Sequence, residues 1–281
     1  MKIGVTVRNM GPESTAPMML GCARTADAMG FESLWITDHI AIEPDNAEGS
    51  GGRYTDPLVT LGWMAGQTRQ IKLGTGVLIV PYRTALPTAK QIATLQELSG
   101  DRLLLGVGVG WMDAEFAALN VPRRQRGRLT DETLAFWHAC FAEDEVLSNG
   151  QPMLFKPRPQ RPPFLVGGAA PHALERACRL GDGWLPMVNL ASENSMAKLA
   201  ANCATYRHLM EEQGRSPQDA KVSVMGALPE ESAHAAAVLQ QLQELGVERL
   251  ICAARYQSLE GYQRTLESVA VNCRAGGLMP G

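Results

Sequence analysis

One histidine stands beside a carboxylate at the point where a short apolar run ends. Residues 33–37 read Ser-Leu-Trp-Ile-Thr, and Asp38 and His39 follow them directly. Imidazole changes its charge near neutral pH, so a histidine at the edge of a cavity can donate a hydrogen bond or move a proton. A structural histidine bonded to a backbone carbonyl is the alternative. We predict that His39 and Asp38 form the catalytic pair.

Glycine gathers at two further places that could serve chemistry. Residues 105–111 read LGVGVGW, and residues 166–168 read VGG. Glycine lets a rigid ligand approach the backbone and leaves amide hydrogens free to hold an anion. The first run matches neither the dinucleotide fingerprint nor a nucleotide-hydrolase phosphate loop. We predict a phosphate cradle, with small residues filling a crowded interior as the alternative. The glycines of this predicted cradle are Gly108, Gly110, Gly167 and Gly168.

The composition narrows the class of protein. The chain has 281 residues, of which 45% are hydrophobic, and 26 Lys+Arg stand against 29 Asp+Glu. This near balance argues against a nucleic-acid partner, and no apolar stretch is long enough for a membrane span, so we expect a cytoplasmic protein. Six cysteines are scattered singly, which favours free buried thiols. No metal site is expected, because the histidines do not cluster at ligand spacing.

Short apolar runs alternate with amphipathic stretches along the chain, a pattern typical of parallel α/β folds. About eight such units at roughly 35 residues each favour one (β/α)8 TIM barrel over residues 1–281, with a doubly wound open sheet as the rival. A barrel would gather the residues named above at one rim, because function lies where the strands end. The expected strands are 3–7, 33–37, 71–79, 102–109, 164–166, 183–187, 222–225 and 249–252, and the expected helices are 16–29, 57–67, 87–98, 130–143, 171–179, 193–212, 231–245 and 259–273.

Two long segments interrupt this alternation. Residues 40–56 form a polar, glycine-containing loop that is a candidate lid, and residues 145–163 contain Ser-Asn-Gly and several prolines, which predicts a hairpin inserted before the fifth strand. These loops would line the substrate pocket.

Thr130 is predicted to cap the helix that follows. The arginines before it are assigned to solvent, with a phosphate contact as the alternative: Arg123, Arg124, Arg126 and Arg128.

Several ordered motifs resemble the bacterial luciferase-like superfamily of flavin- and deazaflavin-dependent oxidoreductases. The resemblance extends from residue 1 to about residue 187 and is closest to the subgroup that uses coenzyme F-420. The motifs are GFESLWITDHI, IKLGTGVLIVPYRTALPTAKQIATLQELSGDRLLLGVGVGWMDAEF, RGRLTDE and FLVGGAAPHALERACRLGDGW.

This resemblance implies a barrel with a ring cofactor across its strand ends. It implies a non-proline cis peptide at Gly76-Val77 behind the ring, and His39 and Asp38 beside the reactive face. It places Gly108, Val109, Gly110, Gly167 and Gly168 at the cofactor phosphate. The glutamate that the family's sugar-phosphate dehydrogenases carry at the end of the fourth strand is absent here, because Val109, Gly110 and Trp111 stand in its place and Glu115 comes later. That departure argues against sugar-phosphate oxidation.

The function we expect is hydride transfer between an F-420-type deazaflavin and a small organic substrate. The alternative is a monooxygenase that receives reduced FMN from a separate flavin reductase. A non-catalytic cofactor-binding barrel is a more remote alternative, against which the glycines and His39 argue. A metal-dependent barrel hydrolase is another, but it needs clustered His and Asp, and only one such pair stands at a strand end. The family often forms dimers, so a homodimer is expected.

Overall fold

Eight parallel strands form one sheet that curls into a nearly closed barrel in the computed structural model, which describes residues 1–278. The order around the sheet is β8-β7-β4-β3-β2-β1-β10-β9, and isolated bridges between Trp184 and Val222 and between Met187 and Met225 link the two ends. The predicted barrel is confirmed; its predicted end, at residue 281, lies outside the described residues. The strands are β1 (Lys2–Thr6), β2 (Ser33–Ile36), β3 (Lys72–Ile79), β4 (Leu103–Gly108), β7 (Phe164–Gly167), β8 (Gly183–Leu185), β9 (Ser223–Gly226) and β10 (Arg249–Cys252).

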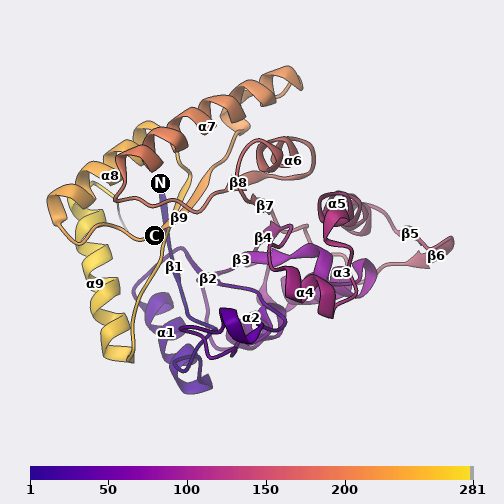
Figure 1. The fold of residues 1–281 in the computed structure, drawn as a ribbon, viewed down its shortest axis with the longest axis horizontal. Coiled ribbons are helices and arrows are strands. Elements are labelled where there is room, and N and C mark those ends of the chain that lie inside the picture. The colour runs from indigo at the N-terminus through magenta and orange to yellow at the C-terminus, as the bar shows by residue number, and fades with distance from the viewer. Residues whose placement is uncertain (279–281) are drawn as a thin grey trace.

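Helices follow the strands and surround the barrel (Figure 1). Side-chain caps begin several of them: Asp56 accepts from Val59 N (3.0 Å), and Ser258 accepts from Gly261 N (3.1 Å). No helix within the described residues is long and apolar enough to cross a membrane. The helices are α1 (Ala16–Ala28), α2 (Pro57–Ala65), α3 (Ala85–Ser99), α4 (Asp113–Ala118), α5 (Arg126–Ala142), α6 (His172–Leu180), α7 (Glu193–Glu212), α8 (Ser232–Glu244) and α9 (Leu259–Ala275).

The barrel interior is filled around Trp35. A Cβ on Gly74 would lie 2.3 Å from the Trp35 ring, and one on Gly4 would lie 2.8 Å from its indole nitrogen. The strand glycines are therefore what lets this large ring enter a narrow barrel. Buried side chains from other strands complete the cluster: Leu104, Leu165, Leu185, Met225 and Ile251.

The inserted hairpin is confirmed. Strands β5 (Glu145–Ser148) and β6 (Gln151–Leu154) pair antiparallel, and Asn149 and Gly150 turn the chain with φ of 49° and 74°. Positive φ at both turn residues is what a two-residue hairpin prefers. The hairpin projects outward beyond α5 (Figure 1).

The predicted cap at Thr130 is wrong. Helix α5 begins at Arg126, and Thr130 Oγ1 donates to the Arg126 carbonyl at 2.8 Å from inside the helix. A threonine hydroxyl can bond the carbonyl four residues back, so it is compatible with a helix interior as well as with a cap.

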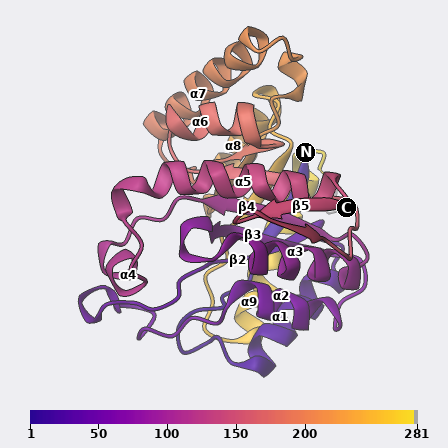
Figure 2. The same cartoon turned by 90° about the vertical axis from the view of Figure 1, so that its right-hand side faces the viewer.

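Figure 2 shows α5 lying along one side of the barrel, with α4 beyond its first turn. Two of the neighbouring arginines form ion pairs with acidic side chains, Arg123 with Asp113 and Arg128 with Glu132. All six cysteines are free and buried, as expected.

Candidate active site

The predicted site residues share one rim of the barrel, at the carboxyl ends of parallel strands. Asp38 and His39 follow β2, Gly76 and Val77 lie near the end of β3, and Gly167 ends β7. Strands β2 and β3 are neighbours in the sheet, so the histidine stands beside the β3 end. The Gly76-Val77 peptide is cis, as the resemblance implied, and the pairing of β3 with β4 is irregular between Thr75 and Leu78.

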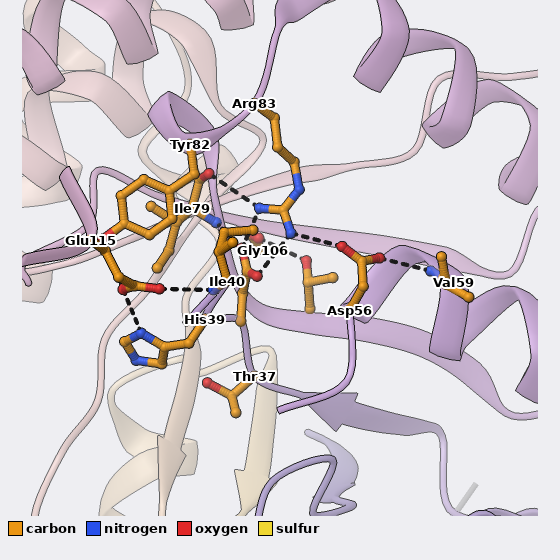
Figure 3. A network of polar contacts seen from close by, with 12 residues as sticks. Thr37, His39, Ile40, Asp56, Val59, Ile79, Tyr82, Arg83, Gly106 and Glu115 are labelled. Carbon is orange, nitrogen blue, oxygen red and sulfur yellow. Dashed lines mark hydrogen bonds and ion pairs between the residues drawn. The ribbon is translucent and has the colours of Figure 1, made fainter. Parts of the chain in front are cut away.

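His39 is held by a buried carboxylate from a helix that follows β4. Glu115 Oε2 lies 2.7 Å from His39 Nδ1, and the two side chains are only 2% and 11% exposed. The other oxygen, Oε1, accepts from the amides of Ile40 (2.7 Å) and Ala41 (3.1 Å), and Tyr82 donates to Oε2 at 3.0 Å. Figure 3 shows His39 and Ile40 on one side of Glu115. One carboxylate therefore fixes both the imidazole and the start of the loop after β2.

This contact determines what His39 can do chemically. A carboxylate only accepts hydrogen bonds when ionised, so we assign the Nδ1 proton to the contact with Glu115. The assignment leaves Nε2 free to accept a proton in the neutral ring and to donate one in the charged ring. The edges of Tyr54 and Trp111 enclose the imidazole, with ring centroids at 4.9 Å and 5.9 Å.

The phenol of Tyr82 reinforces the carboxylate. Burial, followed by the charge of Glu115 and the hydrogen bond to it, raises the pKa of Tyr82 well above the ordinary tyrosine value. The phenol therefore keeps its proton and stays a donor to Glu115 throughout the physiological range.

Asp38 contacts Arg83 and the backbone of β3, and its catalytic role stays a prediction. Its oxygens accept from Arg83 (2.6 and 2.9 Å) and from Ile79 N (2.8 Å), and its side chain is fully buried. Arg83 reaches on to Asp56, the cap of α2, at 3.0 Å (Figure 3). The carboxylate ties the end of β2 to the end of β3 through a two-pronged ion pair. These contacts hold the backbone next to His39 in place.

A cavity of about 470 Å³ opens beside the cis peptide. Apolar side chains on the strand ends form most of its wall, and Ser195, Lys198 and Asn202 of α7 supply polar groups. This size and lining suit an organic ligand with a flat ring. The strand-end residues of the wall are Gly76, Val77, Gly167, Gly168, Trp184, Leu185, Pro186, Met187 and Met225.

The glycines of the predicted cradle divide into two groups. Gly167 and Gly168 line the cavity, and Gly168 has φ of +122°, which a residue with a side chain rarely adopts. Gly108, Val109 and Gly110 are not among its lining residues.

Packing explains Gly108, which ends β4, and Gly110, which lies two residues beyond it. A Cβ on Gly108 would lie 2.5 Å from Val77 Cγ2, and one on Gly110 would lie 2.8 Å from Ile79 and 3.0 Å from Phe116. At these two positions the crowded-interior interpretation is the one that the contacts support.

The structure adds residues that the sequence did not assign to the site: Glu115, Tyr82 and Lys198. The sequence shows that Glu115 comes after the fourth strand, but it does not show that the chain there turns back toward His39. The signal in the sequence is only that Glu115 stands four residues after Trp111, since its burial in the short helix α4 is seen in the structure alone.

The candidate lid is tied at both ends. Glu115 holds residues 40 and 41, and Arg53 donates to Ser14 Oγ and to the Ser14 carbonyl, both at 2.9 Å. The part between these anchors contains the glycines at 49, 51 and 52, all with positive φ. A lid function stays a prediction.

Comparison with curated proteins finds relatives of part of the chain. An uncharacterised protein of Mycobacterium tuberculosis is 31% identical over 183 residues, 58% of this chain and 65% of the relative. A 5,10-methylenetetrahydromethanopterin reductase of Methanolobus tindarius is 34% identical over 170 residues, 58% of this chain and 48% of the relative. The chain thus matches less than two thirds of the length of either protein.

Solved structures share the fold throughout. The monooxygenase RslO1 from Streptomyces bottropensis has a TM-score of 0.80 at 21% identity, covering 98% of this chain and 99% of its own. An F420-dependent secondary alcohol dehydrogenase, solved with an F420-acetone adduct, has a TM-score of 0.71 at 13% identity, covering 95% and 98%. The model of the luciferase-like monooxygenase family matches residues 1–268, a span that contains all eight barrel strands. The chain therefore belongs to the luciferase-like monooxygenase family.

Proposed function

We propose that the protein is an oxidoreductase that transfers a hydride between a deazaflavin of the coenzyme F-420 type and a small organic substrate. The observation that carries this proposal is the pair formed by His39 and Glu115 at the barrel rim. His39 follows β2, which is the neighbour of the strand that holds the cis peptide at Gly76-Val77. The pair provides one oriented proton-transfer group beside a cavity with mostly apolar walls.

The cavity residues fit such a cofactor. Val77, Trp184 and Leu185 offer an apolar surface to a flat ring, and the space beside Gly168 stays open because the residue has no side chain. Lys198 is the cationic side chain of this wall, placed to meet a phosphate on the ligand. When bound, the deazaflavin supplies the hydride chemistry, and the protein binds, orients and excludes water.

His39 supplies the proton chemistry in this proposal. With its Nδ1 proton directed at Glu115, the ring presents Nε2 to a substrate oxygen as donor or acceptor, according to the direction of the reaction. Asp38 acts as a positioning residue, because its oxygens are taken up by Arg83 and the Ile79 amide.

Two kinds of relative, F420-dependent enzymes and monooxygenases, support different cofactors. The F420-dependent secondary alcohol dehydrogenase supports the deazaflavin. A 4-hydroxyprotoasukamycin monooxygenase of Streptomyces nodosus subsp. asukaensis is 31% identical over 129 residues, and with RslO1 it supports the second candidate, a monooxygenase that uses reduced FMN. In that case a separate reductase would have to supply the reduced flavin.

Titration of the purified protein with F-420 and with FMN tests this choice. We expect saturable quenching of F-420 fluorescence and weaker quenching of FMN. Tighter binding of FMN would select the monooxygenase. If the protein binds neither F-420 nor FMN, the result would favour a non-catalytic barrel over both enzymes.

A further inference from the structure

A second cavity, of about 740 Å³, lies at the same rim where β1 and β10 end. In the sheet β1 stands between β2 and β10, so the strand that carries His39 lies between this cavity and the end of β3. Its polar lining differs from that of the first cavity, because three arginines contribute to it: Arg8, Arg255 and Arg264.

Arg8 is held in place by the loop after β10. The Tyr256 hydroxyl oxygen accepts from the Arg8 amide (2.8 Å), and the Arg8 guanidinium donates to the Tyr256 carbonyl (3.1 Å). The guanidinium also pairs with Glu13 at 3.2 Å. These contacts fix the direction of the side chain before any ligand arrives, which lowers the entropy cost of binding.

Arg255 and Arg264 are exposed, and neither has a carboxylate within 4.0 Å among residues 1–278. Arg264 bends back along α9, since its Nη2 lies 3.9 Å from the place a Cβ on Gly261 would take. Both cations therefore stand near the first turn of α9, where the helix dipole also favours negative charge. Two cations without ion partners in one cavity indicate a site for an anion.

One acidic side chain, that of Glu260, is already stabilised in its charged form near these arginines. The pKa of Glu260 is lowered by its own backbone amide, by the Ser258 hydroxyl and by the charge of Arg264. Glu260 is exposed and is not among the residues that line the cavity, so it marks where a carboxylate is favoured without closing the cavity.

We propose that this arginine cavity binds an anionic group of the substrate, a carboxylate or a phosphate, while the reacting carbon of the same substrate lies near His39. The proposal names the substrate class and so rests on the proposed function. The ring cofactor would occupy the first cavity, whose one cation is Lys198, and the substrate anion would occupy the second.

Calorimetric titration of the whole chain with inorganic phosphate, in a buffer without other multivalent anions, tests the site. The double variant Arg255→Gln/Arg264→Gln should bind phosphate on the order of tenfold more weakly than the unaltered protein. The matched control is Arg274→Gln, an exposed arginine near the other end of α9, which should bind as the unaltered protein does. Lys198→Gln tests whether the phosphate enters the cofactor cavity instead.

The outcomes separate this inference from the proposed function. Loss of phosphate affinity in Lys198→Gln alone, equal affinity in the double variant and the unaltered protein, or no phosphate binding at all would each overturn the arginine site. Weaker F-420 binding by the double variant would assign the arginines to the cofactor and overturn the substrate assignment. Phosphate binding that depends on Arg255 and Arg264, in a protein that binds neither F-420 nor FMN, would keep the anion site and refute the proposed function.

Discussion

Glu115 Oε2 lies 2.7 Å from His39 Nδ1, although 76 positions separate the two residues in the chain. The carboxylate accepts four hydrogen bonds, from the imidazole, two amides of the loop after β2 and the Tyr82 phenol. An imidazole held in this way has a defined free nitrogen and a defined direction.

Replacement of His39 by alanine should lower turnover by a factor of about 10² to 10⁴, the range that a positioned acid or base contributes. Cofactor binding should weaken only moderately, because the ring does not line the first cavity. Steady-state kinetics and fluorescence titration would measure the two effects. His172→Ala, on an exposed helix position, is the control; unchanged turnover in His39→Ala would remove the imidazole from the mechanism.

The variant Glu115→Gln should lower kcat about tenfold to hundredfold, the usual effect of losing the partner that orients a functional histidine. Its amide can donate to the imidazole, so the preference for a proton on Nδ1 is lost. Nitrogen NMR of the His39 ring would report the tautomer directly. A ring that keeps its Nδ1 proton in this variant would show that Glu115 does not set the tautomer.

Lys198→Gln should weaken binding of the ring cofactor on the order of tenfold, and the remaining affinity should depend less on salt, because one charged contact to the ligand phosphate is gone. Fluorescence titration at two ionic strengths measures both quantities. Lys198→Arg keeps the charge and should restore most of the affinity. A salt dependence identical to that of the unaltered protein would contradict this role.

Gly108→Ala should destabilise the fold by about 1 to 3 kcal/mol, the usual cost of overpacking, because its Cβ would lie 2.5 Å from Val77 Cγ2. Val77→Ala removes that methyl group, so the double variant should recover part of the loss. Urea unfolding of the four proteins gives the coupling energy. Additive effects would show that Gly108 does not serve the packing of Val77.

The ion pair between Glu32 and Arg249 should make stability depend on pH in acid. Burial alone would raise the pKa of Glu32, but the hydrogen bonds and charge of Arg249 outweigh it and lower the pKa to about 2. A carboxylate with a lowered folded pKa stabilises the protein above its unfolded pKa, and this contribution fades as the pH falls from about 4.5 to 2.

Glu32→Gln should therefore lower the free energy of unfolding at pH 7 by up to about 3 kcal/mol, with the difference shrinking toward pH 2. Denaturant unfolding between pH 2 and pH 7 measures it. Glu97→Gln, on the exposed face of α3, is the control and should change little at any pH. A pH-independent difference would show that Glu32 acts through packing.

Local signals in the sequence were enough for the elements. The predicted bounds of α7 and β10 agree with the structure at both ends, because a buried parallel strand is a short apolar run and a helix carries apolar residues at its own period. The strand ends could then be located, and with them His39 and Asp38, whereas the cis peptide at Gly76-Val77 was expected only from the resemblance to the family.

Sequence alone determined that this chain forms a (β/α)8 barrel and that one histidine stands at its functional rim, since both follow from patterns within a few residues. Only the tertiary structure decided what surrounds that histidine. The curvature and register of the barrel bring Glu115 to His39, turn Asp38 toward Arg83 and press Gly108 against Val77. Such contacts join residues far apart in the chain, and their energy depends on packing in three dimensions, which no local pattern encodes.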